Sequence, residues 1–223
     1  MGGRVRDHVA FTEYFAFRVG REEEPSDVVD YCVRMADEFG SPLFEGKLGV
    51  FGVETELAMV SDLTRSLGAG RLHRLDANGV YSVPTARQVC RRLADLGVPW
   101  LENPCRTLDE MARLHDDGVP ISFSTHQVDL VRAARSGVPD AFCIDATEMG
   151  GLRRTQDFVR ACAALGKDFW CYSGDGGARE TWVLPPAATP IAAPSASSSR
   201  PMFGQAASPE GPMLPEFRVT PVF

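Results

Sequence analysis

The sequence lacks an apolar run long enough to span a membrane, and it lacks an excess of positive charge. Its net charge of −7 argues against nucleic acid and anionic membrane surfaces as partners. The N-terminus also lacks the apolar core of a signal peptide. We therefore expect a cytoplasmic protein that acts on a small molecule.

Paired cysteines are missing as well. The six cysteines are scattered, without a CxxC pair, and several lie within periodic apolar segments. This pattern argues against a disulfide framework and predicts reduced, buried cysteines that serve packing.

Lysine is nearly absent: only Lys47 and Lys167 occur among 23 basic residues, and the others are arginine. Arginine stays charged in proteins, whereas a lysine can lose its proton when it is buried or close to a cation. Each lysine of this chain is therefore a candidate for a specific role.

What the sequence does contain is a repeated unit of apolar strand, polar turn and amphipathic helix between residues 9 and 172. Ser26, Ser82 and Thr107 are placed as helix N-caps, and Glu110 completes a capping box with Thr107. We expect strands at 9–17, 43–47, 71–76, 98–102, 120–124, 141–145 and 168–172, and helices at 26–39, 53–67, 83–96, 107–117, 126–136 and 150–165.

Three helices are followed by nearly the same stop signal, LGVPW at 96–100, DGVPI at 117–121 and SGVPD at 136–140. In each, glycine can adopt the left-handed conformation that ends a helix, and proline prevents its continuation. Strands and helices alternating at this pitch predict an α/β fold with a parallel sheet. Seven such units favour a (β/α) TIM-like barrel, incomplete because no eighth unit is visible, over a doubly wound sheet.

The repeat stops after residue 172. Residues 178–223 are rich in Pro, Ala and Ser, which predicts an irregular C-terminal segment with at most a short strand near 217–223. We therefore divide the chain into a barrel domain, residues 1–177, and this segment.

Two neighbouring strands end in an acid, Asp76 and Glu102. All strands of a parallel barrel point their carboxyl ends to one face, so both side chains should meet there. Two adjacent carboxylates repel each other unless a cation or a proton is shared, and oxygen ligands suit Mg²⁺. Either acid alone could instead cap the following helix; the pair favours a metal site.

Lys47 ends the preceding strand on the same face. Near Mg²⁺ its ammonium would be pushed toward the neutral amine, which is the form that a general base needs. A surface lysine is the alternative reading.

At this point the sequence resembles a known family. EGKLG, LDANG, LENPC and IDATEMGGL follow one another as in the barrel domain of the enolase superfamily, within the mandelate racemase group and its glucarate dehydratase-like acid-sugar dehydratases. The resemblance covers about residues 1–175. It implies removal of the proton alpha to a carboxylate with Mg²⁺ as cofactor, followed in dehydratases by loss of a β-hydroxyl. Asp76 and Glu102 would be metal ligands, Asn78 a neighbouring polar contact and Lys47 the base.

The chain also departs from the family pattern. Glu45 replaces the other lysine of a Lys-x-Lys pair. The third metal ligand should end strand five, where Ser124 fits the alignment and His126 is chemically the better ligand, although His126 could simply begin the next helix.

The resemblance further implies a His–Asp dyad. Asp145 ends strand six at the place of its aspartate, but Tyr172 ends strand seven where the histidine is expected. A tyrosine can act as an acid, and its ordinary pKa of about 10 makes it a poor base. Asp175 is a candidate for part of the missing role.

The family's N-terminal capping domain is expected to be absent, because residue 1 falls near the start of the barrel. A Mg²⁺-dependent lyase or isomerase acting on a hydroxy acid is the first reading. The alternatives are a weakly active or non-catalytic barrel that acts as a binding partner, and a metal-free aldolase in which Lys47 forms a Schiff base. Apolar surface at an open barrel mouth would favour a homo-oligomer.

Overall fold

The computed structural model describes residues 11–146, 148–172 and 203–204. The strands are β1 (Phe11–Phe15), β2 (Phe44–Lys47), β3 (Leu72–Asp76), β4 (Trp100–Glu102), β5 (Ser122–Thr125), β6 (Ala141–Ile144), β7 (Asp168–Tyr172) and β8 (Phe203–Gly204). The helices are α1 (Pro25–Phe39), α2 (Val53–Leu67), α3 (Val83–Asp95), α4 (Leu108–Asp116), α5 (Leu130–Ser136) and α6 (Leu152–Ala164).

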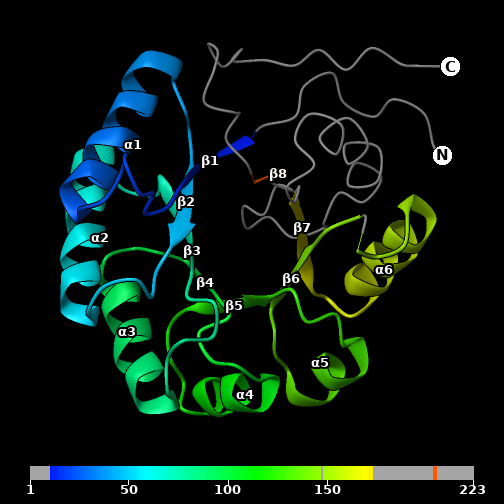
Figure 1. The fold of residues 1–223 in the computed structure, drawn as a ribbon. Helices are drawn as coiled ribbons and strands as arrows, with labels where there is room; N and C mark the ends of the chain where they lie inside the picture. Colours follow the sequence, from blue (N-terminus) through cyan, green and yellow to red (C-terminus); the bar gives the residue numbers. More distant parts are fainter. Residues whose placement is uncertain (1–10, 147, 173–202, 205–223) are drawn as a thin grey trace, which may run out of the picture.

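The strands form one curled parallel sheet. Each strand from β1 to β7 pairs with the next, and the two-residue β8 pairs with both β7 and β1, so that the strand order closes. The helices lie around the outside of this sheet (Figure 1). Seven strands alternating with helices are an incomplete TIM-like barrel, which confirms the fold class predicted from the sequence.

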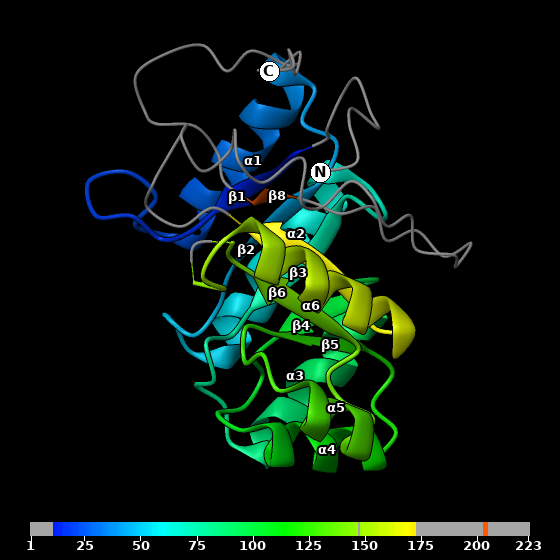
Figure 2. The ribbon, with the colours of Figure 1, turned by 90° about the vertical axis from the view of Figure 1, so that its right-hand side faces the viewer.

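The side chains of each strand alternate between two environments, as strand geometry requires. Phe15, Phe44, Leu75, Leu101 and Phe123 face outward and join the large apolar cluster under helices α1–α4. A second outer cluster, which includes Phe142 and Phe169, packs against α6. A view turned by 90° shows α6 lying along the outside of β6 (Figure 2).

The inside of the barrel is different, because it is largely polar. Its apolar part is a small cluster of Ala141, Cys143 and Trp170, with Trp100 packed against it. Glu45, Arg74, Asp76, Glu102 and Ser124 are also buried. Buried charges are costly unless they are paired, so these residues point to a functional interior.

The helix signals of the sequence are confirmed at most ends. The Ser82 and Thr107 side chains accept hydrogen bonds from the backbone N–H groups of Thr85 and Glu110, and Thr107 and Glu110 form the predicted capping box. The glycines of the three stop signals have left-handed φ values of 79°, 66° and 77° (Gly97, Gly118 and Gly137).

Three helix starts differ from the prediction, and the simplest case is α6, which begins at Leu152 rather than at 150. Helix α1 begins at Pro25 rather than after Ser26, because the carboxylate of Asp27 accepts the backbone N–H of Glu24 at 2.9 Å. Helix α5 begins at Leu130 rather than at 126, because Asp129 caps it through the backbone N–H of Arg132. His126 instead contacts the side chain of Asn103, and Gln127 donates its backbone N–H to the hydroxyl of Thr125.

The cysteine prediction is confirmed, since all six cysteines are free and buried. Within the described ranges, no helix combines the length and the apolar character that crossing a membrane requires. Strand β8 lies in the predicted C-terminal segment and was not foreseen; the strand expected near 217–223, like Asp175, lies outside the described residues.

Candidate metal and proton-transfer site

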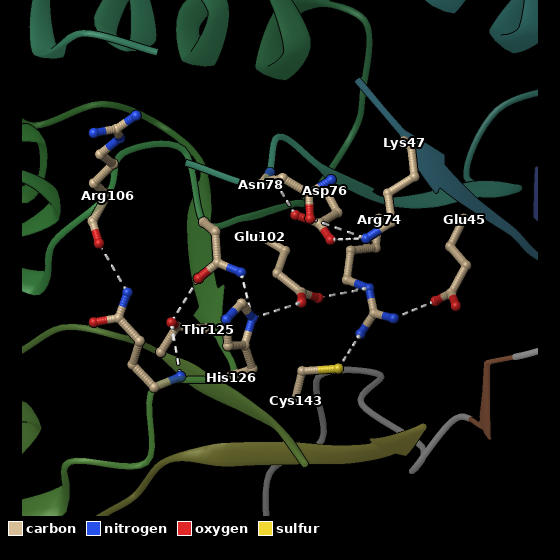
Figure 3. Close-up of polar contacts among 12 residues, drawn as sticks. Glu45, Lys47, Arg74, Asp76, Asn78, Glu102, Arg106, Thr125, His126 and Cys143 are labelled. Atoms are coloured by element: carbon tan, nitrogen blue, oxygen red, sulfur yellow. Dashed lines mark hydrogen bonds and ion pairs between the residues drawn. The ribbon is translucent and has the colours of Figure 1, made fainter. Parts of the chain in front are cut away.

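Four side chains stand in a row at one level of the barrel. Lys47 pairs in register with Asp76, Asp76 with Glu102, and Glu102 with Ser124, on the consecutive strands β2 to β5. Because partners in register on parallel strands point to the same side, this row brings a cation, two carboxylates and a hydroxyl together. The convergence of Lys47, Asp76 and Glu102 that the strand ends predicted is therefore present (Figure 3).

Lys47 is held by the first carboxylate of the row. Its Nζ donates to Oδ2 of Asp76 and lies 3.2 Å from Oδ1 of Asn78. Burial alone would lower the pKa of Lys47, but the charge of Asp76 and its hydrogen bond outweigh this and raise it. In this arrangement Lys47 is an ammonium. It can act as a base only if Asp76 pairs with another cation instead, because the pairing with Asp76 is what raises the pKa of Lys47.

The two carboxylates have opposite pKa shifts. Burial and the charge of Glu102 raise the pKa of Asp76. Burial would also raise the pKa of Glu102, but Arg74 and His126 lower it. Glu102 is therefore more readily ionised than Asp76. Asp76 is the carboxylate that would gain more from an additional positive charge beside it.

Asn78 and Asn103 follow these acids, and both have positive φ values, 49° and 41°. Asparagine tolerates this conformation better than most residues, and such strain often marks functional sites. The N–H of Asn78 donates to Oδ1 of Asp76 at 2.8 Å, so that this oxygen faces the turn. Asn78 thus contacts both Asp76 and Lys47.

His126 lies on the opposite side of Glu102, with its Nδ1 4.0 Å from Oε1 of Glu102. That carboxylate raises the pKa of His126. The amide of Asn103 accepts from the hydroxyl of Thr125 at 2.6 Å and places its Nδ2 2.8 Å from Nδ1 of His126. With the amide in this orientation Nδ1 accepts the hydrogen bond, so in the neutral ring Nε2 carries the proton and is a donor for a substrate oxygen.

The donor set fits an oxygen-liganded divalent cation. Asp76 and Glu102 supply two carboxylates in register. The buried hydroxyl of Ser124 beside Glu102 has no hydrogen-bond partner among the residues that the structure describes. An unpaired buried hydroxyl is costly, and a cation or a water would satisfy it. No group of three His, Cys, Asp or Glu residues suited to a metal ion occurs in the described ranges, so a third ligand of these types is not preassembled beside Asp76 and Glu102.

The remaining predicted residues lie farther along the sheet. Asp145 follows β6, is buried, and raises the pKa of the Cys171 thiol on β7, after the larger effect of burial. The backbone of Tyr172 ends β7 as predicted, but its side chain lies outside the described part of the structure.

Sequence reasoning missed Arg74 and Asn103. Arg74 stands two residues before Asp76 on the same strand, so the period of two could have placed both on one face. Asn103 follows Glu102 directly and orients His126. Glu45, which replaces a lysine of the resembled family, pairs with Arg74 at 2.5 Å.

The chain is similar to known proteins in sequence and in structure. Residues 27–206 match the family described as Enolase C-terminal domain-like. A probable glucarate dehydratase from Streptomyces coelicolor is 29% identical over 184 residues, covering 74% of this chain and 42% of that protein. Muconate cycloisomerase 1-1 from Acinetobacter lwoffii is 23% identical over 175 residues, covering 76% of this chain and 45% of that protein.

Solved structures agree with the fold. An enolase from Thermobispora bispora, complexed with magnesium and formate, superposes with a TM-score of 0.76 at 26% identity, covering 91% of this chain and 50% of that one. An enolase from Mycobacterium smegmatis, complexed with tartrate, gives the same TM-score and identity and covers 91% and 51%. The chain thus spans about half the length of the proteins that it matches. Since the family match extends over most of its residues, the chain belongs to the enolase C-terminal domain-like family.

Proposed function

We propose that this chain is the barrel part of a Mg²⁺-dependent lyase or isomerase that removes the proton alpha to the carboxylate of a hydroxy acid. An acid-sugar dehydratase of the glucarate type is the specific form that we favour. The row of Lys47, Asp76, Glu102 and Ser124 in register carries this proposal. The relatives named glucarate dehydratase and muconate cycloisomerase support a lyase or an isomerase.

Asp76 and Glu102 would hold the cation, with the Ser124 hydroxyl or His126 as a third ligand. For His126 to ligate through Nε2, the amide of Asn103 would have to give up its hydrogen bond to Nδ1, so that Nδ1 takes the ring proton. When bound, Mg²⁺ would supply positive charge for the carboxylate of the substrate. The magnesium in the Thermobispora enolase complex supports this cofactor. Asn78 would keep one oxygen of Asp76 directed at the turn through its backbone N–H.

Lys47 would be the base. In the structure its ammonium is paired with Asp76, which raises its pKa. A cation held by Asp76 would take this partner from Lys47. The burial that lowers the pKa of Lys47 would remain, so the neutral amine would be favoured. The amine would then take a proton from the alpha carbon, as general bases do near their operating pH. Asp145 and Tyr172, near the ends of β6 and β7, are proposed as further proton-transfer groups.

Metal binding is the first test. Calorimetry with Mg²⁺ or Mn²⁺ should show one site in the wild-type protein that Asp76→Ala and Glu102→Ala each abolish. Asp109→Ala, which removes an exposed acid on α4, should leave it unchanged. Metal binding that survives both site substitutions would refute the ligand assignment.

Proton exchange is the second test. With Mg²⁺ and a panel of hydroxy acids that includes glucarate and tartrate, deuterium from solvent should enter the alpha position in the wild-type protein. Lys47→Arg should keep the fold and the metal but stop this exchange. Exchange that continues at the wild-type rate would reject Lys47 as the base, and trapping of a substrate on Lys47 by borohydride would favour the aldolase alternative.

A further inference from the structure

A second row of residues lies one layer below the first. Glu45 pairs in register with Arg74, and Arg74 with Trp100, two positions before the row that contains Asp76 and Glu102. Strand side chains two apart point to the same side, so this lower row also faces the barrel interior. At its centre is Arg74, of which only 7% is exposed.

Arg74 is fixed from several directions. Its Nη2 lies 2.5 Å from Oε2 of Glu45, and its Nη1 lies 3.6 Å from Sγ of Cys143. The guanidinium carbon is 4.4 Å from the centre of the Trp170 ring, which is a cation–π distance. A planar guanidinium held by an ion pair and an aromatic face has little freedom to rotate.

The remaining nitrogen of the guanidinium reaches the upper row. Nε of Arg74 lies 3.4 Å from Oε2 of Glu102. The other oxygen of Glu102, Oε1, is directed toward His126 and lies 4.0 Å from its Nδ1 (Figure 3). The two oxygens of this carboxylate therefore have different neighbours: Oε2 faces Arg74, and Oε1 faces His126.

Glu45 limits how far Arg74 neutralises Glu102. Because Glu45 takes the closest contact of the guanidinium, Glu102 keeps only the longer one through Nε. A bidentate pair between Arg74 and Glu102 would occupy both carboxylate oxygens, and such pairs are among the strongest in proteins. The sharing keeps Arg74 away from Oε1, which faces His126 instead.

We propose that Arg74 is a positioning residue for Glu102: it holds Oε2, so that Oε1 is directed to the cation. Glu45 is the counter-ion that keeps Arg74 from binding both oxygens of Glu102. This inference rests on the proposed function, because it concerns Glu102 as a metal ligand. Glu45 stands where the resembled family has a lysine. In this proposal Glu45 neither binds the metal nor transfers a proton.

The experiment separates positioning from charge. The double variant Glu45→Gln/Arg74→Met removes one negative and one positive charge, so the net charge of the site is unchanged. Outer residues that orient metal ligands typically contribute about 10–100-fold to metal affinity. We expect Mn²⁺ affinity, measured by calorimetry, to fall by about that factor in the double variant. The matched control Asp109→Asn/Arg132→Met removes an exposed ion pair and should bind Mn²⁺ like the wild type.

A conservative variant covers the case in which the double variant does not fold. Arg74→Lys keeps the charge and the pairing with Glu45 but lacks the planar fork, so affinity should again fall by about 10-fold or more. At saturating Mn²⁺, the electron paramagnetic resonance line shape should differ from that of the wild type, because the coordination of Glu102 changes.

The outcomes are distinct. A folded double variant, or Arg74→Lys, with wild-type affinity and line shape would overturn the positioning role and leave the metal site standing. A wild-type protein that binds no divalent metal would overturn both this inference and the proposed function. Weaker binding in both variants together with an unchanged control supports the inference.

Discussion

Glu56 should contribute more to stability than an exposed helical glutamate does, because it is buried and holds a loop. This carboxylate, on α2, is only 1% exposed and accepts the backbone N–H groups of Gly49, Val50 and Phe51 at 2.8 to 3.0 Å. The hydroxyl of Tyr81 lies 3.2 Å from its other oxygen, Oε2. The loop that it holds directly follows Lys47, so Glu56 fixes the chain where the candidate base leaves its strand.

The substitution Glu56→Gln keeps the shape and removes the charge. Three backbone donors would then bond to a neutral oxygen, and a bond to a charged acceptor exceeds a neutral one by about 1 kcal/mol. The lower cost of burying an amide offsets part of this. We expect a loss of about 2–3 kcal/mol in the free energy of unfolding, with faster hydrogen exchange at the amides of residues 49–51.

Urea unfolding followed by circular dichroism measures this loss. Glu54→Gln, two residues earlier on the same helix, is the control, because Glu54 is exposed and its ion pair with Arg92 spans 3.4 Å. Exposed pairs contribute about 0–1 kcal/mol, so this variant should unfold near the wild-type midpoint. If Glu56→Gln is no less stable than Glu54→Gln, the account of Glu56 as the anchor of this loop is wrong.

Two further predictions concern the barrel wall. Gly46→Ala places a methyl group 2.2 Å from the ring of the fully buried Phe15, so it should cost about 3 kcal/mol or more, and Phe15→Leu in the same chain should recover part of the lost melting temperature. The second prediction concerns His73, whose pKa is lowered from 6.5 to about 4 by burial and, to a smaller extent, by the charge of Arg74. Between these two pH values the unfolded chain binds more protons than the folded one. The free energy of unfolding should therefore fall as the pH is lowered through this range. His73→Gln should flatten this part of the urea midpoint against pH, and an identical slope in both proteins would contradict the shift.

The positions of the strands could be predicted from the sequence because each rests on local signals. The Gly-Val-Pro stops fix where helices end, and the strands follow within one or two residues. The start of α5 could not be predicted in this way. His126 belongs to an apparently helical segment, but its ring contacts Asn103, which is distant in the sequence.

The residues of the candidate site also differ in whether local sequence signals reveal them. Asp76 and Glu102 were found because an acid at the end of an apolar strand is visible in the sequence. Arg74 was not, because a charge in the middle of a strand is stabilised only by partners on other strands, here Glu45, Glu102 and Trp170. The sequence shows such a residue but not what neutralises it.

The pairing of β8 with β1 has a consequence for how the barrel forms during synthesis. Phe11 pairs with Phe203 and Thr12 with Gly204, so this contact joins segments about 190 residues apart. Closing so long a loop is entropically costly, and contacts of high sequence separation slow folding. Strands β1 to β7 are made first, and until β8 arrives both β1 and β7 present unpaired backbone groups to solvent. Unpaired edges of this kind pair with other chains, so the nascent protein should be most prone to aggregate after β7 is made and before residues 203–204 are made.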